Sequence, residues 1–138
     1  MWGLHEYWVA TGDEPAREAA RRTAELFLDH RLFRVGGSGE SIHPSFGVLH
    51  YPPYWHYDVL QALVVLERIG LAADPRTEDG LALLEERRLP DGRWRAGGRW
   101  WRPPGSPGAN IEVVDWGSGP DELLTLNALR VLRSAGRG

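Results

Sequence analysis

The stretch LQALVVLERIG at residues 60–70 returns near the C-terminus as LNALRVLRSAG at residues 126–136. Six positions are identical at an offset of 66, from Leu60 on Leu126 to Gly70 on Gly136. Apolar residues lie nearly all round both segments when they are drawn as helices, which is typical of helices buried on several sides. A Gly directly after the last periodic residue indicates a helix end. The two stretches therefore predict a pair of buried, repeated helices.

Two further helices, each with one charged face, alternate with the buried pair. One is predicted from about Glu14 to Leu32, with Asp13 as its N-cap and Pro15 in its first turn. The other is predicted over about residues 74–89 and opens on an Asp-Pro pair. These two helices also repeat each other, because ELFLDHRLF aligns with ALLEERRLP at an offset of 57. Half-buried and buried helices in alternation predict two layers of helices.

The ends of the buried helices carry their own signals. One helix is expected to begin after Pro52-Pro53 and to end near Ile69, and the other to follow Gly119-Pro120, with Ser118 as a possible cap. No segment shows the sustained alternation of a strand, so the expected class is all-α, built of αα-hairpin repeats with long aromatic-rich loops.

The expected organisation is a single domain over residues 1–138. Its first repeat spans about residues 14–70 and its second about residues 74–136. Residues 1–9 resemble the tail of a preceding helix of the buried kind, so we expect the chain to be the C-terminal portion of a larger repeat protein, or to depend on assembly.

The composition excludes several kinds of site. The 138 residues include no Cys, so the chain can form neither a disulfide nor a thiolate metal site. A net charge of −3 gives no general attraction to nucleic acid, which we do not expect as a partner. No apolar run approaches the ~20 residues of a membrane span, and the N-terminus does not resemble an export signal. We therefore expect a cytoplasmic protein with no membrane span.

The segment LLEERRLPDGRW, residues 83–94, resembles the squalene-cyclase and prenyltransferase repeat proteins, and their bacterial members in particular. Those repeats carry a motif that begins with Gln and ends in Gly-x-Trp. Gly92 and Trp94 match its end, whereas Arg87 or Arg88 stands where the Gln is expected. The resemblance implies a terpenoid cyclase-like α/α toroid, here a partial one, with a hydrophobic cavity for an apolar, isoprenoid-like ligand.

The same resemblance does not imply catalysis. The chain lacks the DxDD-type motif of the triterpene cyclases, and it lacks the Cys with which protein prenyltransferases hold zinc. We expect no cofactor, no metal, and no catalytic residue that the sequence can identify.

The first candidate site is LHYPPYWHYD, residues 49–58. His50, His56 and Asp58 could hold a metal or transfer protons, with Trp55 and Tyr57 as walls. His56 and Asp58 are two residues apart, so they would not share a helix face, which disfavours a metal. Two alternatives remain open: packing at a helix start, with Asp58 near the positive end of the dipole, or a pocket that suits an anionic group.

The aromatic residues of this segment do not recur in the second repeat. Trp-His-Tyr stands at residues 55–57, whereas Asp-Glu-Leu stands at residues 121–123. Packing common to both repeats does not explain this difference. We therefore select Trp55, His56, Tyr57 and Asp58 as ligand-binding candidates.

The second candidate site is RRLPDGRWRAGGRWWRPPG, residues 87–105, with six Arg and one Asp up to residue 102. Arg between Trp residues could stack by cation–π contacts and grip a phosphate, or it could simply cover the Trp faces of a folded loop. The ligand-binding candidates here are Trp94, Arg99, Trp100 and Trp101.

The third candidate site is NIEVVDWGSGPDE, residues 110–122. Carboxylates beside an aromatic residue are what a glycosidase uses, and this segment has Glu112, Asp115, Asp121 and Glu122 near Trp116. Asp121 and Glu122 would equally suit the first turn of the helix that follows. Trp116 is the last ligand-binding candidate.

Three hypotheses for function remain open. The first is a repeat domain with an aromatic-lined cavity for an apolar, isoprenoid-like ligand. The second is a non-catalytic structural or protein-interaction module whose exposed helix faces pair with another copy or with missing N-terminal repeats. The third is a carbohydrate-active (α/α) toroid fragment that uses Asp115, Asp121 or Glu122.

Overall fold

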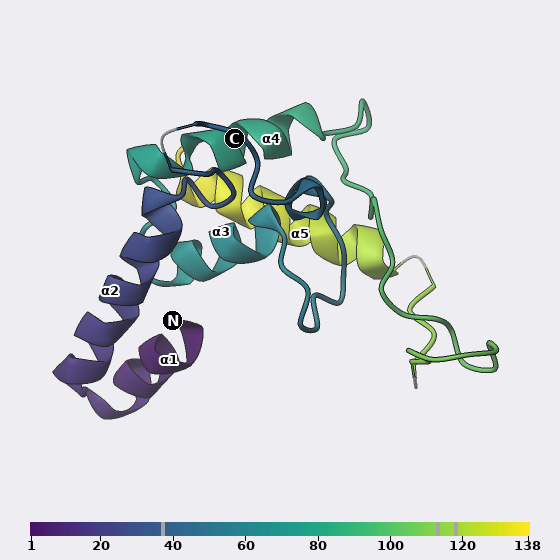
Figure 1. Cartoon of the computed structure of the whole chain (residues 1–138), viewed down its shortest axis with the longest axis horizontal. Helices are drawn as coiled ribbons and strands as arrows, with labels where there is room; N and C mark the ends of the chain where they lie inside the picture. Colours follow the sequence, from purple (N-terminus) through teal and green to yellow (C-terminus); the bar gives the residue numbers. More distant parts are fainter. Residues whose placement is uncertain (37, 113, 118) are drawn as a thin grey trace.

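Helices form the regular structure of the computed structural model, which describes residues 1–36, 38–112, 114–117 and 119–138 (Figure 1). The α-helices are α1 (Trp2–Thr11), α2 (Glu14–Asp29), α3 (Val59–Arg68), α4 (Glu78–Glu86) and α5 (Gly119–Ser134), with short 3-10 helices η1 (Pro44–Gly47) and η2 (Pro75–Thr77). The described residues contain two isolated β-bridges, Arg34–Ser41 and Arg102–Ile111, and no strand. The predicted all-α class is confirmed.

The N-cap predicted for α2 is confirmed, because Asp13 accepts a hydrogen bond from the backbone N–H of Ala16 at 2.8 Å. The helix ends at Asp29, three residues before the predicted end. Leu32 has a φ of 70° and its N–H donates back to the carbonyl of Phe27, which closes the helix end. Asp74 caps η2 instead of the predicted long helix, and α4 follows from Glu78 to Glu86.

The prediction that the first buried helix begins after Pro52-Pro53 is wrong, since α3 begins at Val59. Tyr54 has a φ of 45°, and the N–H of His56 donates to the carbonyl of Pro53 at 2.9 Å, so these residues form a turn. Asp58 is the N-cap, accepting from the N–H of Gln61 at 2.8 Å.

The predicted helix ends at glycine are confirmed. Gly70, with a φ of 79°, follows α3, and Gly136, with a φ of 76°, follows α5. The Ser118 cap predicted for α5 lies outside the described residues.

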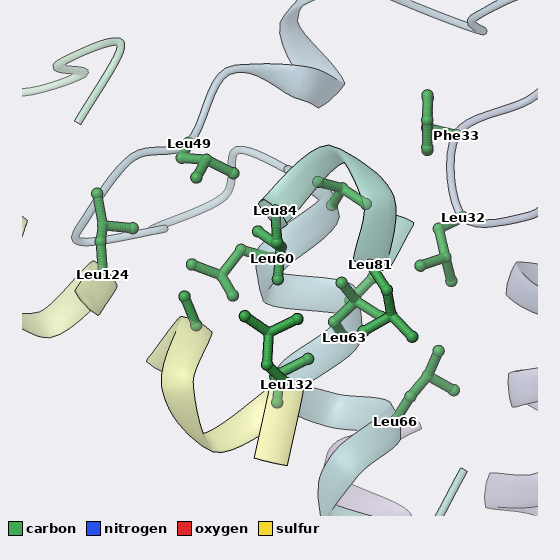
Figure 2. Packing of buried hydrophobic residues seen from close by; sticks show 14 of the residues in the cluster. Leu32, Phe33, Leu49, Leu60, Leu63, Leu66, Leu81, Leu84, Leu124 and Leu132 are labelled. Atoms are coloured by element: carbon green, nitrogen blue, oxygen red, sulfur yellow. The ribbon is translucent and has the colours of Figure 1, made fainter. Parts of the chain in front are cut away.

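Helix α3 lies at the centre of the hydrophobic core and packs against α4 and α5 (Figure 1). In Figure 2, Leu60 and Leu63 of α3 lie among leucines from the neighbouring helices, including Leu81 of α4 and Leu132 of α5. Helices α1 and α2 pack together at one end of the molecule, and the long segment between α4 and α5 extends at the other end. Residues 2–9 are helical, as predicted, but no residue of α1 is buried.

The repeated helices α3 and α5 are buried to different extents. Three pairs of equivalent residues are buried in both helices: Ala62 and Ala128, Val65 and Val131, and Leu66 and Leu132. Leu60 and Leu63, by contrast, are 2% and 0% exposed, whereas Leu126 and Leu129 are 52% and 43% exposed. The expectation that both repeated helices are buried on several sides is therefore wrong for α5. The division into two repeats and the toroid arrangement stay predictions.

No helix in the described part of the chain is long and apolar enough to cross a bilayer. The cytoplasmic location stays a prediction.

The close approach of α4 to α3 depends on Gly80. A Cβ at this position would lie 3.0 Å from a methyl of Val59 and 2.8 Å from a methyl of Leu32. In α1, by contrast, a Cβ at Gly3 would meet nothing within 4 Å.

We expect Gly80→Ala to lower the free energy of unfolding by about 1–2 kcal/mol, because overpacking costs more than the ~1 kcal/mol that Ala gains over Gly in a helix. The matched control Gly3→Ala should leave stability equal or higher. Urea unfolding followed by circular dichroism measures both. Equal gains in the two variants would contradict tight packing between α3 and α4.

Candidate functional site

A buried ion pair joins the start of α3 to the segment that precedes it. Asp58 is 1% exposed and His50 is 3% exposed. His50 Nδ1 lies 2.7 Å from Asp58 Oδ2, and the backbone N–H of His50 donates to the same oxygen at 3.0 Å. Because Asp58 Oδ1 accepts from Gln61, both carboxylate oxygens are engaged. Asp58 thus caps α3 and also holds His50, whereas the sequence suggested only a favourable interaction with the helix dipole.

Both nitrogens of the His50 ring lie near hydrogen-bond acceptors. Besides Asp58, the carbonyl of Val48 lies 3.3 Å from Nδ1 and the carbonyl of Pro53 lies 3.4 Å from Nε2. A protonated ring can donate from both nitrogens, whereas a neutral ring cannot. Burial by itself lowers the pKa of His50, but the hydrogen bond to Asp58 and its negative charge outweigh burial, so the pKa is raised.

Tyr57 is held by a different contact. Its hydroxyl donates to the backbone carbonyl of Leu32, and burial together with the charge of Asp58 raises the pKa of this phenol. Its ring packs edge-on against Phe46, with 4.7 Å between centroids. The hydroxyl is therefore engaged in joining two segments of the fold, and the ring remains as an apolar surface.

The first two candidate segments meet in space. The ring of His56 stacks on Trp100, with 4.2 Å between centroids and 20° between planes, and Trp55 lies 5.3 Å from His56. The edge of His50 meets the same Trp100 at 5.8 Å. This contact between residues more than 40 positions apart was not predicted.

A pocket of about 360 Å³ lies at this contact. Its lining combines aromatic rings with two guanidinium groups, and the residues are Trp55, His56, Arg99, Trp100, Trp101, Arg102 and Asn110. It contains five of the nine predicted ligand-binding residues. We call it the Trp100 pocket.

Two other cavities lie along α3 and share three lining residues, Trp2, Gln61 and Val65. The first, of about 330 Å³, is also lined by Met1, Phe27, Tyr54, Trp55, His56, Tyr57 and Ala62. The second, of about 240 Å³, is also lined by His50, Tyr51, Pro53, Asp58, Leu60, Val64, Arg68, Leu124, Asn127 and Arg130. We call the two together the α3 groove.

The α3 groove includes residues that the sequence did not identify. Trp2 comes from α1 and is 43% exposed; its indole N–H donates to Glu6 at 2.7 Å, and the guanidinium of Arg68 lies 4.8 Å above the ring. Gln61 and Val65 come from α3, the helix that the repeat assigned to the core; Gln61 is half-buried and Val65 is buried. The available signal was the presence of two Trp residues, Trp2 and Trp8, in the N-terminal helix.

Trp94 lies apart from both sites. It is fully buried, its indole N–H donates to the carbonyl of Leu84 at 2.7 Å, and Arg88 lies over its ring at 5.4 Å. Its backbone N–H donates to the hydroxyl of Thr125 at 3.0 Å. Trp94 therefore joins α4 to α5. Its full burial under Arg88 matches the alternative in which Arg covers a structural Trp, although Trp94 also borders a pocket of about 380 Å³ beside Asp121 and Glu122.

The remaining Trp candidates pack on the segment before α3. Trp101 is 5% exposed, donates from its indole N–H to the carbonyl of Tyr51 at 3.3 Å, and lies under the guanidinium of Arg99 at 4.7 Å. Trp116 meets the ring of Tyr51 edge-on at 5.7 Å and is not among the residues that line the Trp100 pocket. Within the described residues, the buried indole N–H groups of Trp100 and Trp116 have no hydrogen-bond partner.

Two carboxylates of the third candidate segment accept hydrogen bonds from backbone groups. Asp121 accepts from the N–H of Ala96 at 2.8 Å, and Asp115 accepts from the N–H of Gly117 at 3.0 Å. Asp121 and Glu122 line a pocket of about 380 Å³ in which Asp115 takes no part. The structure therefore does not bring the three carboxylates together in one pocket. Val113 and Ser118 of this segment lie outside the described residues.

The described residues contain no group of three or more His, Asp or Glu side chains that could hold a metal ion. His50 and Asp58 form a pair, whereas His56 stacks on Trp100.

No family model, curated protein or solved structure matches this chain. The resemblance to the squalene-cyclase and prenyltransferase repeat proteins stays a prediction.

The His50–Asp58 pair should make stability depend on pH. Because the pKa of His50 is raised in the folded protein, its contribution is fully present below its unfolded pKa of ~6.5 and is lost as the pH rises through the folded value. We expect His50→Gln to cost about 2–4 kcal/mol at pH 5.5, and less at pH 8.5.

Urea unfolding of both proteins at the two pH values measures this difference. Asp58→Asn removes the charge that raises the pKa, so it should also flatten the pH dependence. An equal cost of His50→Gln at both pH values would show that the ring is not held protonated by Asp58.

Proposed function

We propose that this chain binds an elongated apolar ligand, isoprenoid-like in character, in the α3 groove. The observation that carries the proposal is the pair of adjoining cavities that share Trp2, Gln61 and Val65 along one side of α3. Their volumes, about 330 and 240 Å³, are together of the size that small-molecule sites have, ~300–1,000 Å³.

The chemistry of the lining favours an apolar occupant. The larger cavity is walled by the rings of Trp2, Phe27, Tyr54, Trp55 and Tyr57. The hydroxyl of Tyr57 is engaged by a backbone carbonyl, so this residue offers mainly its ring to a ligand. Burial of apolar surface gains roughly 25 cal/mol per Å², and it is the main source of affinity that such walls can supply.

Large aromatic side chains at the groove are exposed to water. Trp55 is 74% exposed, Trp2 is 43% exposed and Tyr54 is 40% exposed. Single exposed apolar residues are ordinary, but three aromatic residues around one cavity form a patch of the kind that marks a binding site. A ligand in the groove would cover part of this patch.

A partial α/α toroid is the proposed frame for the groove. Its support is the set of equivalent positions that are buried in both α3 and α5, such as Ala62 with Ala128 and Leu66 with Leu132. The proposal concerns binding and not catalysis. The carboxylate of Asp58 and the ring of His50 contact each other, and both are also engaged by backbone groups.

The test is equilibrium dialysis with tritiated farnesol, an uncharged isoprenoid alcohol whose binding is detected without Trp fluorescence. Gln61→Trp places a large ring where both cavities meet, so we expect it to weaken binding at least tenfold. Trp2→Ala removes a wall that both cavities share and should weaken binding as well. Circular dichroism confirms that each variant folds.

Arg99→Ala is the matched control, because Arg99 lines the Trp100 pocket and neither cavity of the α3 groove. Binding that survives Arg99→Ala and is lost in Gln61→Trp supports the groove. Binding that is lost only in Arg99→Ala places the ligand in the Trp100 pocket and contradicts the proposal, as does a wild-type protein that binds no farnesol.

A further inference from the structure

We propose that α5 packs antiparallel against α5 of a second copy of this chain, through a stripe formed by Glu122, Leu126, Leu129 and Arg133. We call these four residues the α5 stripe. All four are exposed, and the two leucines at the centre are 52% and 43% exposed. The contact lies outside the α3 groove and does not depend on ligand binding.

The four residues lie on one face of the helix. Their spacings of four, three and four residues follow the 3.6-residue turn, so they form a single row about 17 Å long. The buried residues Leu124, Ala128 and Val131 lie on the opposite face and pack into the core. The stripe therefore faces away from the rest of the chain.

The leucines of the stripe have buried equivalents in the first repeat. Leu60 and Leu63 occupy the same repeat positions in α3 and are 2% and 0% exposed. Helix α3 is flanked by α4 and α5. Among the main contacts between helices of the described chain, α5 packs against α3 alone. The two leucines therefore form a small apolar surface that the described residues leave uncovered.

The charges of the stripe identify the cover as a second copy. Glu122 lies one turn before the two leucines and Arg133 lies one turn after them. The midpoint of the two charged residues is also the midpoint of the two leucines, and it falls between residues 127 and 128. A two-fold axis at this midpoint places Glu122 opposite Arg133 of the second copy, and Leu126 opposite Leu129. Such a self-complementary surface is what a symmetric dimer requires.

The charges at the two ends of the stripe are not used within the chain. Among the described residues, the side chains of Glu122 and Arg133 form no ion pair, whereas Arg130 pairs with Glu67 at 3.1 Å and Arg137 with Glu85 at 2.9 Å. Both charges suit the dipole of α5, but the dipole does not explain the exposed leucines between them.

One pair of helices buries less surface than the ~1,200 Å² of a stable interface, so we expect weak, concentration-dependent association. Sedimentation equilibrium of the full chain from micromolar to millimolar concentration measures it. Leu129→Glu should abolish dimer formation. The matched control Leu26→Glu, at a position of α2 that is 60% exposed, should not change it. A wild-type chain that is monomeric throughout would overturn the proposal.

Charge exchange tests the antiparallel geometry. Glu122→Arg and Arg133→Glu should each weaken self-association at least tenfold, because each places like charges opposite one another twice. An equimolar mixture of the two variants restores both ion pairs and should dimerise like the wild type. The double variant should also dimerise, although both of its new charges oppose the helix dipole.

A mixture that stays monomeric, or single variants that associate as well as the wild type, would overturn the arrangement. Thermal unfolding of each variant separates loss of dimer from loss of fold. None of these substitutions changes Trp2, Gln61 or Val65, so the result for self-association is independent of the result for farnesol binding.

Discussion

The carboxylate of Asp58 is the contact on which the position of α3, and with it the α3 groove, depends. One oxygen completes the first turn of the helix, and the other holds both the backbone and the ring of His50. A charge buried this deeply costs several kcal/mol unless it is paired and hydrogen-bonded. The segment before α3 folds back onto the helix start, where His50 supplies the partner that the buried carboxylate needs.

That constraint also determines where the aromatic residues lie. Residues 51–57 form a loop closed at both ends by the His50–Asp58 pair, and the turn at Tyr54 directs Trp55 outward, where it is 74% exposed. The edge of His50 and the face of His56 both contact Trp100, which anchors the segment between α4 and α5 to the same pair. A single buried ion pair thus joins two long segments to the central helix.

Local signals account for what the sequence could predict. Asp13, Gly70 and Gly136 act within one turn of their own helices, so their roles were readable from the neighbouring residues. The start of α3 was misread because the Pro pair is itself a typical helix start, although the cap bond from Gln61 to Asp58 is local. The sequence also could not show that Trp94 is fully buried whereas Trp55 is exposed, because the burial of a side chain depends on which helices pack around it. The sequence identified Trp55, His56, Tyr57 and Asp58, which line the α3 groove, but it did not identify Trp2, because that wall comes from α1.

The neighbours of α3 and α5 explain why two helices of similar sequence are buried to different extents. Helix α3 is flanked by α4 and α5, whereas the main helix contact of α5 is with α3. Helix α5 shows this at Leu126 and Leu129, whose equivalents in α3 are buried. Its residues Leu124, Asn127 and Arg130 line the α3 groove, whereas none of the four residues of the stripe does. Because the two surfaces do not overlap, a dimer formed through α5 would leave the groove open, and a ligand in the groove would leave the stripe free.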